Sequence, residues 1–228
     1  MSAQFEVKDG FILPACYKLF QFLRLISVFT LIRFINLKFW ELRNHEKYDP
    51  KHVPIKCRPV TKRYVFSEAW ALGNLVASIL AGTCAYLIPW APLQIVILCH
   101  AVIRTLELFV YQVNVLLFDP LTNPQTYAIK SATRMVILLI MNMIEYTFWF
   151  SCVYSCLCFL VEGMMPEGFV FVLESFNQMT NLSSPADISV VHFQILAFFE
   201  TLVGMFMNLV CLARFIGLLP SVRTIDDN

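Results

Sequence analysis

The sequence predicts an all-helical membrane protein with four transmembrane helices, a re-entrant pore helix and loop between the third and the fourth, and an N-terminal amphipathic interfacial helix. Hydrophobic residues make up 58% of the 228 residues, and charged residues only 14%. A soluble domain of this length cannot bury so much apolar surface, so the composition favours the membrane class. Long charge-poor segments, interrupted by one polar run, supply the rest of the prediction.

Basic residues are concentrated at the N-terminal end. Residues 1–63 contain twelve of the seventeen Lys and Arg and five acidic residues, whereas the remainder contains five basic and eleven acidic residues. Because basic segments beside transmembrane helices remain on the cytoplasmic side, we expect the N-terminal end to be cytoplasmic. Four spans return the other end to the same side, so we predict a multi-pass protein of the plasma membrane with both termini cytoplasmic.

Residues 11–40 are apolar but carry a polar side chain at every third position. These side chains are Lys18, Gln21, Arg24, Ser27, Thr30, Arg33 and Asn36. A spacing of three nearly matches the helical repeat, so they form one slowly drifting stripe. Voltage-sensing helices place Arg in this way, but only three of the stripe residues are cationic. This favours an amphipathic helix on the anionic cytoplasmic leaflet, followed by a charged linker that completes a first region, 1–65.

Four later segments are apolar over the length that a bilayer requires, which is about 20 helical residues. They cover about 66–88, 93–118, 131–161 and 189–219. The first two form a predicted region of accessory helices, 66–127. The last two, with the segment between them, form a predicted pore module, 128–228.

The segment from Gly168 to Ile188 separates the third and fourth spans. It begins with about a dozen mostly apolar residues and ends in a polar run. A short helix, a polar loop and a long helix in this order are what a re-entrant pore loop requires, since irregular backbone at membrane depth must be buried by protein or lined by water. The residues that we expect to line an ion path are Thr180, Asn181, Leu182, Ser183, Ser184 and Asp187. Asp187 can also cap the last helix.

Ionisable and polar groups inside the spans provide further candidates, because such groups are costly there and are usually paired or water-facing. Arg104 and Glu145 lie at similar distances from the loop between the second and third spans, which predicts an ion pair; a proton or ion relay is the functional alternative. Glu200, Gly204 and Asn208 share one face of the last span, as expected for a water-filled cavity or for close packing. We expect Gly204 to be a hinge, Asn208 to line the cavity, and Glu200 to support the pore helix from behind or to face the cavity.

The eight cysteines do not resemble a disulfide framework, since six lie inside apolar runs where Cys behaves as a small hydrophobe. Cys152, Cys156 and Cys158 have no His or acidic residue within their own run. We therefore expect no metal site.

Two passages resemble the pore module of the potassium-channel superfamily. They are Ser175-Phe-Asn-Gln-Met-Thr180 with Asp187-Ile188, which resembles a pore helix entering a filter, and Glu200-Thr-Leu-Val-Gly204 with Ala213-Arg-Phe-Ile-Gly-Leu-Leu219, which resembles an inner helix. The resemblance covers roughly residues 128–220, and the two preceding spans are similar to the extra helices of small four-span bacterial channels. It implies a homotetrameric ion channel that passes monovalent cations without catalysis and without a bound cofactor.

The chain departs from this family at the filter itself. Family filters contain a Thr-Val-Gly-Tyr-Gly-Asp type of run, whose glycines allow successive carbonyl groups to face the ion. Here the corresponding run, Thr180 to Asp187, has no glycine, and Pro185 favours extended backbone at Ser184. We therefore expect a cation pore with weak or unusual selectivity.

Other functions are open at this stage. The missing glycines and the lipid-seeking N-terminal helix also suit a non-conducting or lipid-interacting membrane protein that retains the pore fold. A transporter is disfavoured because the sequence has no internal repeat, and an enzyme because it has no nucleophile–base set. The partners that we predict are further copies of the chain and membrane lipids, and no nucleic acid.

Overall fold

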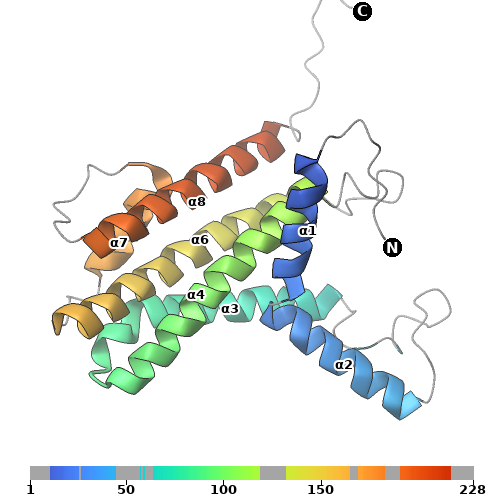
Figure 1. Ribbon diagram of the computed structural model, residues 1–228, viewed down its shortest axis with the longest axis horizontal. Helices are drawn as coiled ribbons and strands as arrows, with labels where there is room; N and C mark the ends of the chain where they lie inside the picture. Colours follow the sequence, from blue (N-terminus) through green and yellow to red (C-terminus); the bar gives the residue numbers. More distant parts are fainter. Residues whose placement is uncertain are drawn as a thin grey trace, which may run out of the picture. The chain divides into compact units, whose positions relative to one another are not determined.

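A computed structural model of the chain describes residues 11–25, 27–44, 57, 59, 64–118, 132–164, 169–182 and 191–216. Every regular element in these ranges is helical (Figure 1). The α-helices are α1 (Ile12–Leu25), α2 (Val28–Asn44), α3 (Tyr64–Cys84), α4 (Ala91–Val113), α6 (Ala132–Leu157), α7 (Val170–Thr180) and α8 (Val191–Ile216). A 3-10 turn, η4 (Ala85–Leu87), follows α3, and π-helical turns extend α4 and α6 as η5 (Asn114–Phe118) and η6 (Cys158–Glu162).

In the part of the chain that the structure describes, four helices are long and apolar enough to cross a membrane, which confirms the prediction of an all-helical fold with four such segments. The candidate spans are Val65–Cys84, Ala91–Val113, Val136–Glu162 and Val191–Ala213. The pair α1 and α2 would make a fifth candidate if it were counted as one broken span. A helix also occupies the place expected for the pore helix, since α7 lies between the third and fourth spans in the sequence.

The chain divides into two compact units. The first consists of Met1–Leu80 and Cys99–Tyr127, and the second of Ala81–Leu98 and Ala128–Asn228. The second unit therefore combines the predicted pore module with the tip of the α3–α4 hairpin. Each unit has its own set of buried polar contacts.

In the first unit, α1 packs against the end of α4. The ring of Phe20 lies 6.2 Å from that of Phe109 and 5.7 Å from that of Phe118, while Tyr17 meets Phe118 edge-on at 5.5 Å. Contacts of this kind add to the burial of apolar surface. They place α1 alongside α4 in the antiparallel direction, because the next contact of the N-terminal segment reaches Glu107, earlier in α4.

The N-terminal amphipathic segment is two helices rather than the single helix predicted from its stripe. The axes of α1 and α2 differ by 65°. The Ser27 hydroxyl, immediately before α2, donates to the Glu107 carboxylate, and the backbone N–H of Phe29 donates to the same oxygen at 2.9 Å. A carboxylate is favoured there because the first N–H groups of a helix have no intrahelical partner and carry partial positive charge. The break is thus capped by a residue 80 positions further along the chain.

Glu107 is also half of a buried ion pair. Nη1 of Arg104 lies 2.8 Å from its Oε2, and the two side chains are only 7% and 6% exposed. The Arg104 guanidinium lies 6.0 Å from the ring of Trp70, a second favourable contact for a cation. One carboxylate thus links α4 to the start of α2 and neutralises a buried cation.

Replacing Glu107 by Gln should destabilise the protein by about 3–5 kcal/mol, because it leaves the buried Arg104 cation without its negative partner. The new amide N–H group would also face groups that are themselves donors, such as the Phe29 N–H. The control is Glu41→Gln in the exposed pair Lys38–Glu41, whose atoms lie 3.5 Å apart at the same i,i+3 spacing. That change should cost no more than about 1 kcal/mol. Equilibrium unfolding in detergent micelles measures both values, and equal costs would contradict the role given to Glu107.

Candidate functional site

The candidate site is built around α7, the short helix that packs against both α6 and α8 (Figure 1). Its buried residues are Val172, Ser175, Gln178 and Met179, which recur at helical spacing on one side. Two of these four are polar, and buried polar groups must find hydrogen-bond partners. The second unit supplies those partners from the two long helices.

An aromatic cluster joins the three helices near the beginning of α7. It consists of Tyr154 from α6, Phe171 from α7 and Phe193 from α8. Their ring centroids lie 5.7 Å, 6.0 Å and 6.3 Å apart in pairs. These separations are typical of favourable aromatic contacts. The cluster fixes the start of α7 to the start of α8.

Ser175 forms the central contact of α7. Its Oγ lies 2.8 Å from the backbone carbonyl oxygen of Thr147 in α6 and is also hydrogen-bonded to Oε1 of Glu200 in α8. Ser175 and Glu200 are both fully buried. We call Thr147, Ser175 and Glu200 the Glu200 cluster. It connects all three helices through one hydroxyl group.

Gln178 makes the second polar contact of this face. Its Nε2 donates to Glu174 on α7 itself at 3.1 Å. The hydroxyl of Thr201 on α8 donates to Oε1 of Gln178 at 3.0 Å. The amide is therefore satisfied at both ends, and it adds a further bond between α7 and α8.

The end of α7 rests directly on the backbone of α8. A Cβ atom added to Gly204 would lie 2.6 Å from the carbonyl oxygen of Met179 and 2.9 Å from its Cα, so only glycine permits this approach. One helical turn further along α8, Nδ2 of Asn208 donates to the same carbonyl at 3.2 Å. Gly204 and Asn208 thus hold the last turn of α7. This describes how the two residues are packed; their predicted roles as hinge and cavity-lining group stay predictions.

The C-terminus of α7 closes in a left-handed turn. Asn181 has a φ of 56°, and its N–H bonds to the carbonyl of Gln178 at 3.2 Å. The N–H of Leu182 bonds to the carbonyl of Asn177 at 3.0 Å, which completes a Schellman motif. Asn takes the place that glycine usually has, because its short polar side chain tolerates this conformation. The hydroxyl of Thr180 donates back to the carbonyl of Phe176 at 2.7 Å.

α7 and α8 run in the same direction. Phe171 contacts Phe193, Ser175 contacts Glu200, and Met179 contacts Gly204, so residue numbers rise together in both helices. The two helices therefore begin at one level of the unit, and α7 ends beside the middle of α8.

The predicted path-lining residues fall into two groups. Thr180 is the last residue of α7, and Asn181 and Leu182 follow it directly, with Leu182 71% exposed. Ser183, Ser184 and Asp187 lie outside the described residues.

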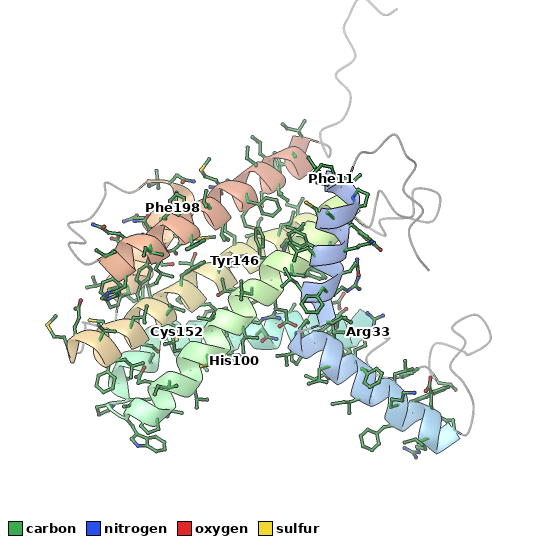
Figure 2. All side chains as sticks on the ribbon, in the orientation of Figure 1. Phe11, Arg33, His100, Tyr146, Cys152 and Phe198 are labelled. Atoms are coloured by element: carbon green, nitrogen blue, oxygen red, sulfur yellow. The ribbon has the colours of Figure 1, made fainter. Side chains whose placement is uncertain are left out.

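The predicted ion pair Arg104–Glu145 joins residues of different units. Within the first unit Arg104 pairs with Glu107, and within the second Glu145 accepts a hydrogen bond from Nε1 of Trp149 at 3.1 Å. A bond between Arg104 and Glu145 themselves stays a prediction. His100 is exposed on α4 (Figure 2).

Sequence reasoning placed Ser175 and Gln178 in a pore-helix motif but identified neither as a contact residue, and it missed Thr147 and Tyr154. Only Ser175 and Gln178 carried a usable signal, because polar residues three apart in a short apolar helix indicate one buried polar face. Thr147 contributes a backbone carbonyl, which no side-chain pattern reveals.

All eight cysteines are free. Within the ranges that the structure describes, no group of three His, Cys, Asp or Glu side chains is arranged to hold a metal ion. No family model, no curated protein and no solved structure matches the chain. The geometry around α7 is therefore the basis on which a function can be proposed.

Replacing Gly204 by Ala should destabilise the second unit by about 1–3 kcal/mol, because the added methyl group meets the backbone of Met179 rather than a flexible side chain. Gly73→Ala is the matched control: Gly73 also lies within a long helix, but nothing lies within 4 Å of its added Cβ. That change should be neutral, or stabilising by up to about 1 kcal/mol, through helix propensity. Thermal unfolding in detergent compares the two variants, and similar midpoints would contradict the close approach.

Proposed function

We propose that the protein is an oligomeric ion channel that passes cations, in which α6, α7 with the loop after it, and α8 form the pore module of each subunit. The observation that carries the proposal is the parallel course of α7 and α8 from one level of the unit. A helix that enters beside α8 and ends at its middle has the course of a pore helix. We propose that the residues that follow it lie at membrane depth.

The length of the connecting segment supports a re-entrant loop. Eight residues, 183–190, separate Leu182 from Val191. An extended chain spans at most about 3.3–3.6 Å per residue, or about 26–29 Å for eight residues. The eleven residues of α7 rise by about 16 Å. The segment can therefore return from the end of α7 to the start of α8, and its polar composition suits a path lined by water.

The charge of the second unit favours cations. The sequence contains no Lys or Arg between Arg134 and Arg214, and six acidic residues in the same interval. The C-terminal end of α7 adds the negative pole of a helix dipole at the start of the loop. We propose that Asp187 contributes a carboxylate to the mouth of the path. An anion would meet only unfavourable charge there.

The proposed selectivity is weak. Ladders of filter carbonyls need glycine, and none occurs between Gly168 and Gly204. The carbonyl groups of the last turn of α7 are already engaged, by the turn itself and by Asn208. Hydroxyl and amide oxygens of the polar run, beginning at Thr180, would coordinate partly hydrated monovalent ions instead.

Several copies must surround an axis, because one loop cannot enclose a path; we propose four. The face of α8 that does not contact α7 carries exposed apolar side chains such as Phe198, which suit lipid or neighbouring subunits (Figure 2). We place the channel in the plasma membrane with both termini cytoplasmic. The exposed apolar side chains of α2, which include Phe34 and Phe39, would then lie in the cytoplasmic leaflet.

The bonded last turn of α7 and the missing glycines also favour a second candidate, a non-conducting or lipid-interacting protein that retains the pore fold. Currents across a planar bilayer, with potassium on one side and sodium on the other, test both. The proposed channel gives a current that reverses close to zero voltage, since it discriminates weakly between the two ions. A reversal potential strongly shifted toward the equilibrium potential of potassium would contradict weak selectivity. The absence of any current at all voltages tested would favour the second candidate.

A pair of variants tests where the charge acts. Asp187→Asn should lower the cation conductance most strongly at low salt, because surface charge is screened as the ionic strength rises. Asp226→Asn, near the C-terminal end, removes the same charge far from the loop in sequence and should leave the conductance unchanged. Equal conductance in both variants would contradict the proposed position of Asp187 at the mouth of the path.

A further inference from the structure

We infer that Glu200 is a positioning residue for α7 and that it is held in the folded protein as the neutral carboxylic acid. The inference begins from the hydrogen bonds of Ser175, whose Oγ is within bonding distance of two oxygens, one from Thr147 and one from Glu200. A serine hydroxyl has one proton and two lone pairs. It can therefore donate only once.

Counting protons assigns the donors. The carbonyl of Thr147 has no proton to give, so the contact between it and Ser175 requires the Ser175 proton. The contact between Ser175 and Glu200 then needs a proton from Glu200. If Ser175 donated to Glu200 instead, its oxygen would face the Thr147 carbonyl at 2.8 Å with no proton between them. A protonated Glu200 gives each contact its own proton, whereas a carboxylate would leave both contacts to share the single proton of Ser175.

The surroundings of the carboxyl group agree with this count. Glu200 is fully buried, and among the residues that the structure describes its second oxygen, Oε2, has no hydrogen-bond partner. The ion pairs found in the same ranges, Lys38–Glu41 and Arg104–Glu107, do not include it. A carboxylate has two charged oxygens to satisfy and is costly to bury without a cation. The neutral acid avoids that cost.

Two further titratable groups act on Glu200 from the helices packed against it. The Tyr154 hydroxyl of α6, which is also buried, interacts with the carboxyl group, and so does Glu174 of α7. Tyr154 can donate a proton but brings no positive charge. Glu174 is a second carboxyl group, and two neighbouring carboxyl groups disfavour a charge on both. As a donor, the Tyr154 hydroxyl favours the carboxylate, but the burial of Glu200, which is the larger effect, and the neighbouring Glu174 both disfavour it.

A proton on Glu200 therefore completes a chain of bonds from α8 through α7 to α6. Its loss would leave Ser175 able to keep only one of its two partners, and α7 would lose a bond to one long helix. The consequence for an ion path beside α7 rests on the proposed function. The protonation of Glu200 does not, since it follows from the packing of the second unit alone.

Infrared difference spectroscopy of the purified full-length protein at neutral pH tests the inference. The spectrum of the wild type minus that of Glu200→Gln should contain the carbonyl stretching band of a protonated carboxylic acid, and this band should shift on exchange into deuterated buffer. The control, wild type minus Glu41→Gln, should contain only carboxylate bands, because Glu41 pairs with Lys38. Carboxylate bands for Glu200 would overturn the inference.

The positioning role has its own measurement. Glutamine can donate an N–H to Ser175 and mimics the neutral acid, so Glu200→Gln should unfold in detergent at the same midpoint as the wild type. A lowered midpoint, or failure of Glu200→Gln to fold, would overturn the inference, because it would mean that the charge is needed. Neither experiment requires conduction. A protein that shows the acid band but passes no current would contradict the channel proposal and would still support the inference that Glu200 is protonated.

Discussion

The hydroxyl of Ser175, bonded to α6 on one side and to α8 on the other, is the contact on which the arrangement of the second unit depends. An isolated helix of eleven residues is not stable, because nucleation costs more than so few hydrogen bonds return. α7 is therefore a helix only because its neighbours hold it. They do so at three levels: through an aromatic cluster at its start, through the Glu200 cluster at its centre, and through Gly204 and Asn208 at its end.

This dependence explains why polar groups are buried where apolar packing would be simpler. A short helix between two long ones can slide or rotate if only apolar side chains hold it, since such contacts are not directional. The hydrogen bond that Ser175 donates to Thr147 and the one that Gln178 accepts from Thr201 fix both the rotation of α7 and its position along its own axis. The absence of a side chain at Gly204 then permits backbone contact. The first unit uses the same device, where Glu107 fixes the start of α2.

The sequence could predict those parts of the fold that depend on composition and local spacing. The four long helices followed from hydropathy, and the position of α7 followed from a short apolar run that ends in polar residues. Glu200 and Gly204 were found because they share one face of α8. Support of the pore helix by Glu200 was among the expectations, but its partner Ser175 and the contact of Gly204 with Met179 were not specified. The path-lining role of the residues from Thr180 to Asp187 and the pair Arg104–Glu145 stay predictions.

Contacts over long sequence separations could not be predicted. The stripe on residues 11–40 suggested one continuous helix, but Glu107 caps a break at Ser27, and nothing in the stripe itself indicates a partner 80 residues away. The partner of Ser175 on α6 is a backbone carbonyl, which every residue possesses. Arg104 pairs with Glu107, three positions along its own helix, and this contact was not specified by the sequence.

The most direct test of the channel proposal is the number of chains in the membrane particle, because a single α7 and its loop cannot surround a path. Native mass spectrometry of the protein released from nanodiscs measures it. We predict a particle of four times the 26.3 kDa mass of the chain. A monomer that persists at every protein concentration tested would contradict a shared pore.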